Sequence, residues 1–99
     1  MQDTAFYKTA RWEAKRKAIL KRDGYEDQIL KRYGKHVPAE TVHHIFPVED
    51  YPEFKWSTWN LISVSKDTHN KLHDRATGSL SDEGMALLKR TARKYNLSI

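Results

Sequence analysis

The stretch that decides the fold begins Val42-His43-His44-Ile45-Phe46-Pro47, passes through Trp59-Asn60-Leu61 and ends Thr68-His69-Asn70-Lys71-Leu72-His73. Its first run is rich in β-branched and aromatic residues and stops at a proline, which is typical of a short strand. Its last run carries two histidines four residues apart, a spacing that places both on one face of a helix. Two imidazoles on a strand and two on a helix are what a divalent metal ion beside a spare base needs.

The order strand, loop, strand, helix is predicted across this stretch. Strands over residues 41–46 and 61–65 flank a loop whose acidic side chains and proline indicate a solvated surface segment. Ser65 or Asp67 can cap the following helix, which we expect to extend to about Arg75. Aromatic residues near Asn60 could form either a small core or a platform for base stacking; they are Phe54, Trp56 and Trp59.

A helix is predicted on each side of this unit. Residues 6–22 contain neither glycine nor proline, so we expect a helix that ends at Asp23-Gly24. Its thin apolar stripe consists of Tyr7, Ala10, Ala14 and Ala18, with Trp12 and Ile19 on another side. The last helix follows Ala76-Thr77-Gly78, with Ser79 or Ser81 as its cap. Its apolar stripe consists of Met85, Leu88, Ala92 and Tyr95.

The functional positions resemble a known motif. The series His43-His44, Asn60, His69 and His73 is similar to the HNH endonuclease motif, and its double histidine resembles the variant in nuclease colicins. The flanking sequences Lys21-Arg22-Asp23-Gly24-Tyr25 and Thr68-His69-Asn70 resemble small stand-alone HNH proteins of bacteriophages. The resemblance covers residues 6–75, with the core motif at residues 42–75.

That resemblance implies an α+β fold and assigns roles to the histidines. The expected architecture is a ββα-metal (HNH or His-Me finger) core, with a short β-hairpin and flanking N- and C-terminal helices, in one domain over residues 1–99. His44 would be the general base, and His43, His69 and His73 would be metal ligands. Asn60 would act in catalysis, either by orienting the loop or the base or by lying closer to the metal.

The implied cofactor is one divalent metal ion. Three imidazoles bind Zn, Ni, Co or Mn readily, whereas Mg prefers oxygen ligands, so the sequence leaves these five ions open. A structural zinc site could use the same three histidines, but it would leave His44 without a role. Adjacent strand residues point to opposite faces, so a nuclease site requires either a bent strand end or a substrate between His43 and His44.

The chain contains no cysteine, which excludes disulfides and thiolate metal sites. Phage proteins of the resembling kind often hold a structural zinc with two Cys-x-x-Cys pairs. The matching positions here are Asp27, Leu30, Ser65 and Thr68. We therefore expect packing to hold this segment, and the candidate residues are Tyr25, Ile29, Leu30, Tyr33 and Val37.

The charge of the chain suits a polyanionic partner. Eighteen Lys and Arg residues against 13 Asp and Glu residues give a net charge of +5. Basic helix residues are often only solvated, but beside this motif we expect DNA contacts from Arg16, Lys21, Arg22, Lys71 and Arg75. Because most of this charge lies on helices suited to phosphates, we expect weak sequence preference. No run approaches the roughly 18 apolar residues of a membrane helix, so no membrane partner is expected.

Three functions fit these observations. The leading prediction is a metal-dependent DNA endonuclease or nickase from a phage or prophage, acting in the cytoplasm of the bacterial host. The resemblance further implies a link to DNA packaging, with the large terminase subunit and the portal as partners. The alternatives are a non-catalytic nucleic-acid-binding module with a structural metal, and an HNH nuclease that acts on RNA.

Overall fold

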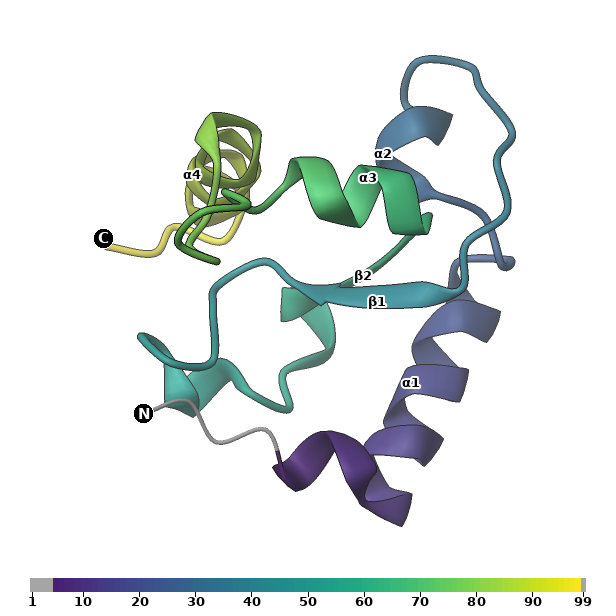
Figure 1. Ribbon diagram of the computed structural model, residues 1–99, viewed down its shortest axis with the longest axis horizontal. Helices are drawn as coiled ribbons and strands as arrows, with labels where there is room; N and C mark the ends of the chain where they lie inside the picture. Colours follow the sequence, from purple (N-terminus) through teal and green to yellow (C-terminus); the bar gives the residue numbers. More distant parts are fainter. Residues whose placement is uncertain (1–4, 99) are drawn as a thin grey trace.

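The computed structural model describes residues 5–98, and it has the predicted α+β architecture. A two-stranded antiparallel hairpin lies at the centre, with the first long helix on one side and the later helices on the other (Figure 1). The helices are α1 (Ala10–Arg22), α2 (Gln28–Lys31), α3 (Lys66–Lys71) and α4 (Asp82–Lys94), and the strands are β1 (Thr41–His44) and β2 (Leu61–Val64). Short 3-10 helices are η1 (Ala5–Lys8), η2 (Pro52–Phe54) and η3 (Thr58–Asn60).

The register of the hairpin sorts its residues between two hydrophobic clusters. Val42 pairs with Ser63 and His44 with Leu61, so these side chains share the face that packs against α1. Thr41 pairs with Val64 and His43 with Ile62, and these side chains face α3 and α4. The adjacent residues His43 and His44 therefore point to opposite faces of the sheet, as strand geometry requires.

The N-terminal helical region differs from the expected single helix. It divides at Thr9, whose hydroxyl accepts a hydrogen bond from the Trp12 amide (3.1 Å) and caps α1. The buried residues of α1 are Trp12, Ile19 and Leu20, whereas the alanines of the predicted stripe are exposed. The prediction of the buried face was wrong because large aromatic and aliphatic side chains gain far more from burial than alanine does.

Helix α4 is rotated relative to the predicted stripe. Met85 and Tyr95 are 37% and 44% exposed, and the buried residues of this helix are Gly84, Leu87, Leu88, Thr91 and Ala92. Ser81, one of the two predicted caps, accepts a hydrogen bond from the Gly84 amide. A Cβ atom at Gly84 would clash with the Leu72 carbonyl oxygen, so this glycine allows α4 to approach the end of α3.

Helix α3 is shorter than predicted. Ser65 caps it, since the Ser65 hydroxyl accepts from the Thr68 amide, and the helix ends at Lys71 rather than near Arg75. His73 lies beyond this end and pairs with Leu80 in an isolated β-bridge. The strands are also one or two residues shorter than expected. The i, i+4 spacing predicted that His69 and His73 share one face of a helix. Only His69 lies on α3, and His73 lies in the loop that follows.

Hydrogen bonds and part of the predicted apolar packing hold the segment before β1: Ile29 packs against a hydrophobic cluster, and Leu30 and Val37 are half-buried. Tyr25 and Tyr33 are 56% and 74% exposed, which contradicts their predicted packing role. Asp27 is fully buried instead, and its carboxylate accepts from the amides of Ile29 (3.0 Å), Leu30 (2.9 Å) and Ser65 (2.8 Å). Burial raises the pKa of this carboxyl, but hydrogen bonds from Thr68, Leu30 and Ser65 outweigh it, and the net pKa is lowered. A buried carboxylate therefore joins Leu30, Ser65 and Thr68, which with Asp27 are the four positions that the resemblance matches to cysteine pairs.

The outer edge of β2 is closed by a second carboxylate. Asp23 accepts a hydrogen bond from the Ser63 amide (3.0 Å), and Arg22 donates to the Leu61 carbonyl (2.7 Å) while pairing with Asp23 (2.8 Å). These contacts occupy backbone groups that a free strand edge would otherwise leave unpaired. Among the described residues, no helix has both the length and the apolar character required to cross a membrane.

Candidate metal centre and catalytic site

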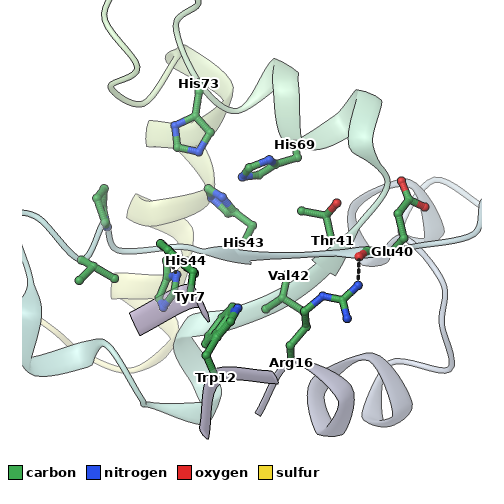
Figure 2. A pocket seen from close by; sticks show the side chains of 12 residues that line it. Tyr7, Trp12, Arg16, Glu40, Thr41, Val42, His43, His44, His69 and His73 are labelled. Carbon is green, nitrogen blue, oxygen red and sulfur yellow. Dashed lines mark hydrogen bonds between the residues drawn. The ribbon is translucent and has the colours of Figure 1, made fainter. Parts of the chain in front are cut away.

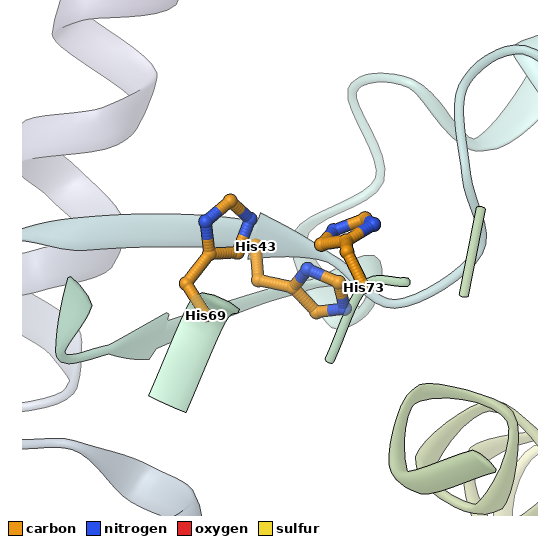
Figure 3. Close-up of side chains that lie close together, drawn as sticks. All are labelled: His43, His69 and His73. Atoms are coloured by element: carbon orange, nitrogen blue, oxygen red, sulfur yellow. The ribbon is translucent and has the colours of Figure 1, made fainter. Parts of the chain in front are cut away.

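Three of the predicted histidines come together on one side of the hairpin. His43 extends from β1, His69 from α3 and His73 from the loop after α3, and their rings face one another (Figure 3). Ligand nitrogen atoms from the three side chains all lie within 4.8 Å of one another. The ring centroids are separated by 5.3 Å, 5.2 Å and 4.9 Å. One divalent ion can be held by such a cluster.

His43 has the environment expected of a metal ligand. Its side chain is 1% exposed, and its Nε2 atom is buried without a hydrogen-bond partner among residues 5–98. Burial lowers the pKa of this imidazole well below its usual value, and the nearby His69, His73 and His44 lower it further. His43 is therefore neutral, and a buried nitrogen without a partner is an unusual feature that a coordinated cation would resolve.

His69 and His73 also have environments that suit metal ligands. Burial and the neighbouring His73 lower the pKa of His69, so its imidazole is also neutral near pH 7. Nδ1 of His73 donates to the Gly78 carbonyl oxygen (3.1 Å), because a carbonyl can only accept. This hydrogen bond leaves the lone pair on Nε2 of His73. Backbone carbonyls commonly orient metal-ligating histidines in this way.

His44 lies on the opposite face of β1, with its ring stacked on Trp12 at a centroid distance of 5.2 Å. Its Nε2 atom donates to the Lys55 carbonyl oxygen (3.0 Å), which assigns the lone pair to Nδ1. Nδ1 faces the Tyr7 hydroxyl at 3.4 Å. Burial lowers the pKa of His44, which outweighs the opposing effect of its hydrogen bond to Lys55. The side chain is a neutral, oriented imidazole whose Nδ1 lone pair accepts a long hydrogen bond from the Tyr7 hydroxyl.

A cavity of about 320 Å³ joins the two sets of histidines around the outer edge of β1. Figure 2 shows His43, His69 and His73 on one side of the strand, and His44, Tyr7 and Trp12 on the other. The strand does not need to bend for the four histidines of the motif to line one cavity. A substrate that lies across the edge of β1 would contact the three clustered imidazoles and His44 together.

The sequence matches no protein-family model and no curated protein, but the fold matches a solved nuclease. That structure is the HNH endonuclease of the deep-sea thermophilic bacteriophage GVE2, solved with a manganese ion. The two chains share 33% identity and superpose with a TM-score of 0.64, and the match covers 67% of this chain and 72% of the other. This chain belongs to the HNH endonuclease family. Its fold is that of a phosphodiester hydrolase of that family, and its three clustered histidines are compatible with the HNH motif.

Asn60 of this HNH protein holds the end of the hairpin together. It is fully buried, and its Oδ1 accepts from the Phe46 amide (2.7 Å). Its Nδ2 donates to the carbonyls of Phe46 and Phe54, both at 3.1 Å. All three hydrogen bonds therefore go to backbone, which corresponds to the loop-orienting role among those predicted. A direct part in catalysis stays a prediction.

The aromatic residues near Asn60 form cores rather than one exposed platform. Phe54 and Trp59 pack edge-on against Phe46 at centroid distances of 5.5 Å and 5.6 Å. Trp56 belongs to the other cluster, where it contacts Phe6 and Trp12. The predicted small core is confirmed, but it does not include Trp56.

The predicted DNA-binding residues of the HNH protein occupy different environments. Arg16 lines the cavity, where its guanidinium donates to Glu13 (3.1 Å) and to the Glu40 carbonyl (2.8 Å). Arg75 is exposed and lines a neighbouring depression with His69 and His73. Lys21 and Lys71 are exposed at the surface. Arg22 is bound to Asp23, Thr58 and Leu61, so its guanidinium has an internal role, and its contact with DNA stays a prediction.

Sequence reasoning missed two residues at the site. Tyr7 and the Lys55 backbone hold the two nitrogens of His44, and they lie 37 and 11 residues away from it in sequence. Tyr7 was assigned to an apolar helix stripe, but it is 37% exposed and faces the cavity. No local pattern signals these contacts, because they depend on how η1 and the loop pack against β1.

Proposed function

We propose that the protein is a divalent-metal-dependent DNA endonuclease or nickase in which Nδ1 of His44 is the general base. The observation that supports this most is the orientation of His44. Lys55 occupies its Nε2 atom, while Nδ1 faces a cavity lined by the three clustered histidines and accepts only a long hydrogen bond from the Tyr7 hydroxyl (3.4 Å), which a water molecule would have to replace. A neutral imidazole whose lone pair faces the substrate cavity can accept a proton near neutral pH.

The reaction is hydrolysis of a phosphodiester. His44 removes a proton from a water molecule, whose oxygen forms a bond to phosphorus while the bond from phosphorus to the 3′ oxygen breaks. A divalent ion held by His43, His69 and His73 supplies, when bound, positive charge that stabilises the phosphorane and the departing oxygen. The 3′ oxygen then takes a proton from solvent. The products are a 5′ phosphate and a 3′ hydroxyl.

Manganese is the first ion to test. The related GVE2 endonuclease was solved with manganese, and three imidazoles suit Mn, Zn, Ni and Co better than Mg. One ion per chain is expected, because the histidine cluster is the one such group found among residues 5–98. Asn60 supports this site by orienting the loop after β1.

DNA is the proposed substrate, and its phosphates would meet the basic residues around the cavity. Arg16 lies on the cavity wall, Arg75 lies beside the clustered histidines, and Lys21 on α1 and Lys71 on α3 are exposed to solvent. Contacts of this kind position a duplex without reading its sequence. We therefore expect weak sequence preference and an affinity that falls steeply with salt. A salt-independent affinity for one short duplex would contradict this substrate model.

Plasmid nicking tests the proposal directly. Purified protein is incubated with supercoiled DNA and Mn, Ni, Zn, Co or Mg, and the wild type is compared with His44→Ala. Loss of the base should slow cleavage by about 100- to 10,000-fold while metal affinity stays the same. His36→Ala is the matched control, because His36 is 73% exposed and pairs with Glu26 away from the cavity.

The outcomes of this assay separate the candidate functions. Equal rates for His44→Ala and the wild type would remove His44 from the mechanism. A wild type that binds DNA and metal but cleaves with none of the five ions would favour the non-catalytic binding module. Cleavage of RNA in preference to DNA in a parallel assay would favour the RNA nuclease.

A role in phage DNA packaging is the finer part of the proposal, and it rests on the family resemblance alone. It would place the protein in the cytoplasm of the host bacterium with the large terminase subunit and the portal as partners. Co-purification of the tagged protein with these two proteins from phage-infected cells is the test. Failure to co-purify with either protein would limit the proposal to the nuclease activity.

A further inference from the structure

A short chain of hydrogen bonds links Asp27 to the metal cluster. The Asp27 carboxylate accepts from the Ser65 amide (2.8 Å), and the Ser65 carbonyl accepts from the His69 amide (2.9 Å). A parallel path runs through side chains, since the Ser65 hydroxyl donates to Thr68 (3.1 Å) and Thr68 also interacts with the Asp27 carboxylate. Asp27, Ser65 and Thr68 are all buried. One buried carboxylate therefore contacts Ser65, the N-cap of the helix that carries His69, and Thr68 in its first turn.

Helix α3 needs such an anchor because it is too short to position itself. It contains six residues, far fewer than an isolated helix needs to be stable in water. Its C-terminal end is held independently, because the Ser81 hydroxyl donates to the Lys71 carbonyl (2.6 Å) and the Ser81 amide donates to Leu72 (2.9 Å). The N-terminal end, one turn before His69, is held by Asp27 and its partners.

We propose that Asp27 is a positioning residue of the metal centre, whose carboxylate fixes the start of α3 and thereby places His69 against His43 and His73. The inference rests on the proposed metal site. Partners behind a metal ligand typically change metal affinity by about 10- to 100-fold when they are removed. Asp27 acts one step further back, through the backbone of Ser65, and it anchors a helix rather than a single ring.

The substitution Asp27→Asn removes this link selectively. One carboxylate oxygen accepts from Ile29 and Leu30, and the other accepts from Ser65. An asparagine can keep its oxygen toward α2, where asparagine is also a good helix cap. Its amide group would then face the Ser65 N–H, and two donors cannot bond to each other. Helix α2 stays capped while the contact to α3 is lost.

Asp23 provides a matched control. It is also a carboxylate, with a side chain 8% exposed, that accepts a hydrogen bond from a β2 amide, that of Ser63 (3.0 Å). Ser63 lies inside the strand, two residues before the cap of α3, so Asp23→Asn should loosen β2 without releasing the helix. Equal destabilisation by the two substitutions with unequal effects on metal affinity would identify positioning rather than general loss of stability.

The experiment is a Mn²⁺ titration of the wild type, Asp27→Asn and Asp23→Asn by calorimetry, at a temperature at which circular dichroism shows each variant to be folded. We expect Asp27→Asn to weaken Mn²⁺ binding by about 10-fold or more, and Asp23→Asn to change it by less than about 2-fold. In nicking assays, Asp27→Asn should need more Mn²⁺ for half-maximal rate but approach the wild-type rate at saturating Mn²⁺.

A second pair of variants covers the case in which Asp27→Asn does not fold. Thr68→Val keeps the shape of the side chain and removes its hydroxyl, whereas Thr68→Ser retains the hydroxyl. Weaker Mn²⁺ binding by Thr68→Val, with recovery in Thr68→Ser, would support the inference. Unchanged binding in folded Asp27→Asn, or in Thr68→Val where Asp27→Asn does not fold, would overturn it.

His69→Ala separates this inference from the proposed function. If His69→Ala binds Mn²⁺ as tightly as the wild type does, the metal site is wrong and the role of Asp27 fails with it. If the wild type binds Mn²⁺ through His69 but does not cleave DNA, the proposed catalysis fails. The titration of Asp27→Asn then still decides whether this residue positions the metal centre.

Discussion

The two edges of the β1–β2 hairpin differ in what covers them. At the edge of β2, the amides of Ser63 and Ser65 donate to Asp23 and Asp27, and Arg22 donates to the Leu61 carbonyl. At the edge of β1, Arg16 binds the Glu40 carbonyl just before the strand, and beyond it the edge borders the cavity. The Ile45–Asn60 hydrogen bond implies, through ladder alternation, that the outward backbone groups of β1 are those of Val42 and His44.

This difference shows how a two-stranded sheet can support a site. A pair of short strands has two edges and little stability of its own, so an uncovered edge is a liability. Here carboxylates cover the edge that packs against α2 and the end of α1. The other edge separates His43 from His44, and it borders the cavity in which we propose that the phosphodiester binds. The β2 edge therefore contributes stability, and the β1 edge borders the proposed catalytic site. The following experiments test this division.

The largest effect is expected from His69→Ala. Removing a ligand from the β1 side should reduce metal affinity by more than the about 10- to 100-fold that is typical of losing a partner behind a ligand. Cleavage should fall with it, while the carboxylates at the β2 edge keep the hairpin folded. Mn²⁺ titration and nicking assays on the same preparation measure both quantities. An unchanged titration would remove His69 from the ligand set.

Chelation should separate activity from fold. A chelator is expected to abolish cleavage, while circular dichroism still shows a helical protein with a cooperative thermal transition. The hydrophobic clusters do not depend on the histidine cluster, since Trp12, Leu61 and Leu88 pack among apolar residues. An ion that binds only the native state stabilises it by about 2.7 kcal/mol at 100 times its Kd, so a lower melting temperature is expected. Global unfolding in chelator, or two tightly bound ions per chain, would contradict this division.

Asp23→Asn should destabilise the β2 edge of the hairpin without changing the rate of DNA nicking. The substitution would leave the Ser63 amide poorly satisfied, and a buried unsatisfied donor costs about 1–3 kcal/mol. Urea unfolding should therefore show a lower free energy of unfolding, while the nicking rate of the folded variant at saturating Mn²⁺ stays that of the wild type. A lower nicking rate at saturating metal would show that the two edges are not independent.

The smallest effect is expected for the dependence of the free energy of unfolding on pH. In chelator, burial keeps the pKa values of His43, His44 and His69 below their usual value of 6.5. The unfolded chain therefore binds more protons below about pH 6.5, and the free energy of unfolding should decrease as the pH falls through that region. Each fully titrating histidine contributes up to about 1.4 kcal/mol per pH unit. Urea unfolding between pH 7.5 and 5.5 measures this slope.

The covered edge should respond at lower pH. For Asp23 and Asp27, burial raises the pKa but hydrogen bonds outweigh it, so both pKa values are lowered. Their contribution to stability is present above the unfolded pKa of about 3.9 and is lost as the pH falls through the lower native value. Asp27→Asn should therefore leave the slope between pH 7.5 and 5.5 unchanged, whereas His44→Gln should reduce it. The opposite pattern would show that acid acts first on the β2 edge.

The sequence by itself determined the family motif and the order of the core elements. The β-prone run before Pro47, the glycine- and proline-free N-terminal segment and the spacing of the histidines are local patterns, and local backbone preferences follow from them. The sequence also excluded thiolate metal sites, because a chain without cysteine cannot form one. These features led to the hairpin, the flanking helices and the histidines that cluster on one side of it.

Only the tertiary structure decided how those residues work together. The fold places His73 beyond the end of α3, joins Tyr7 and Lys55 to His44, and buries Asp27 against Ser65. Each of these contacts bridges segments that are separate in sequence, and each depends on how neighbouring elements pack rather than on a local period. The same holds for the open edge of β1: strand geometry sends His43 and His44 to opposite faces, and the cavity around that edge brings them back into one site.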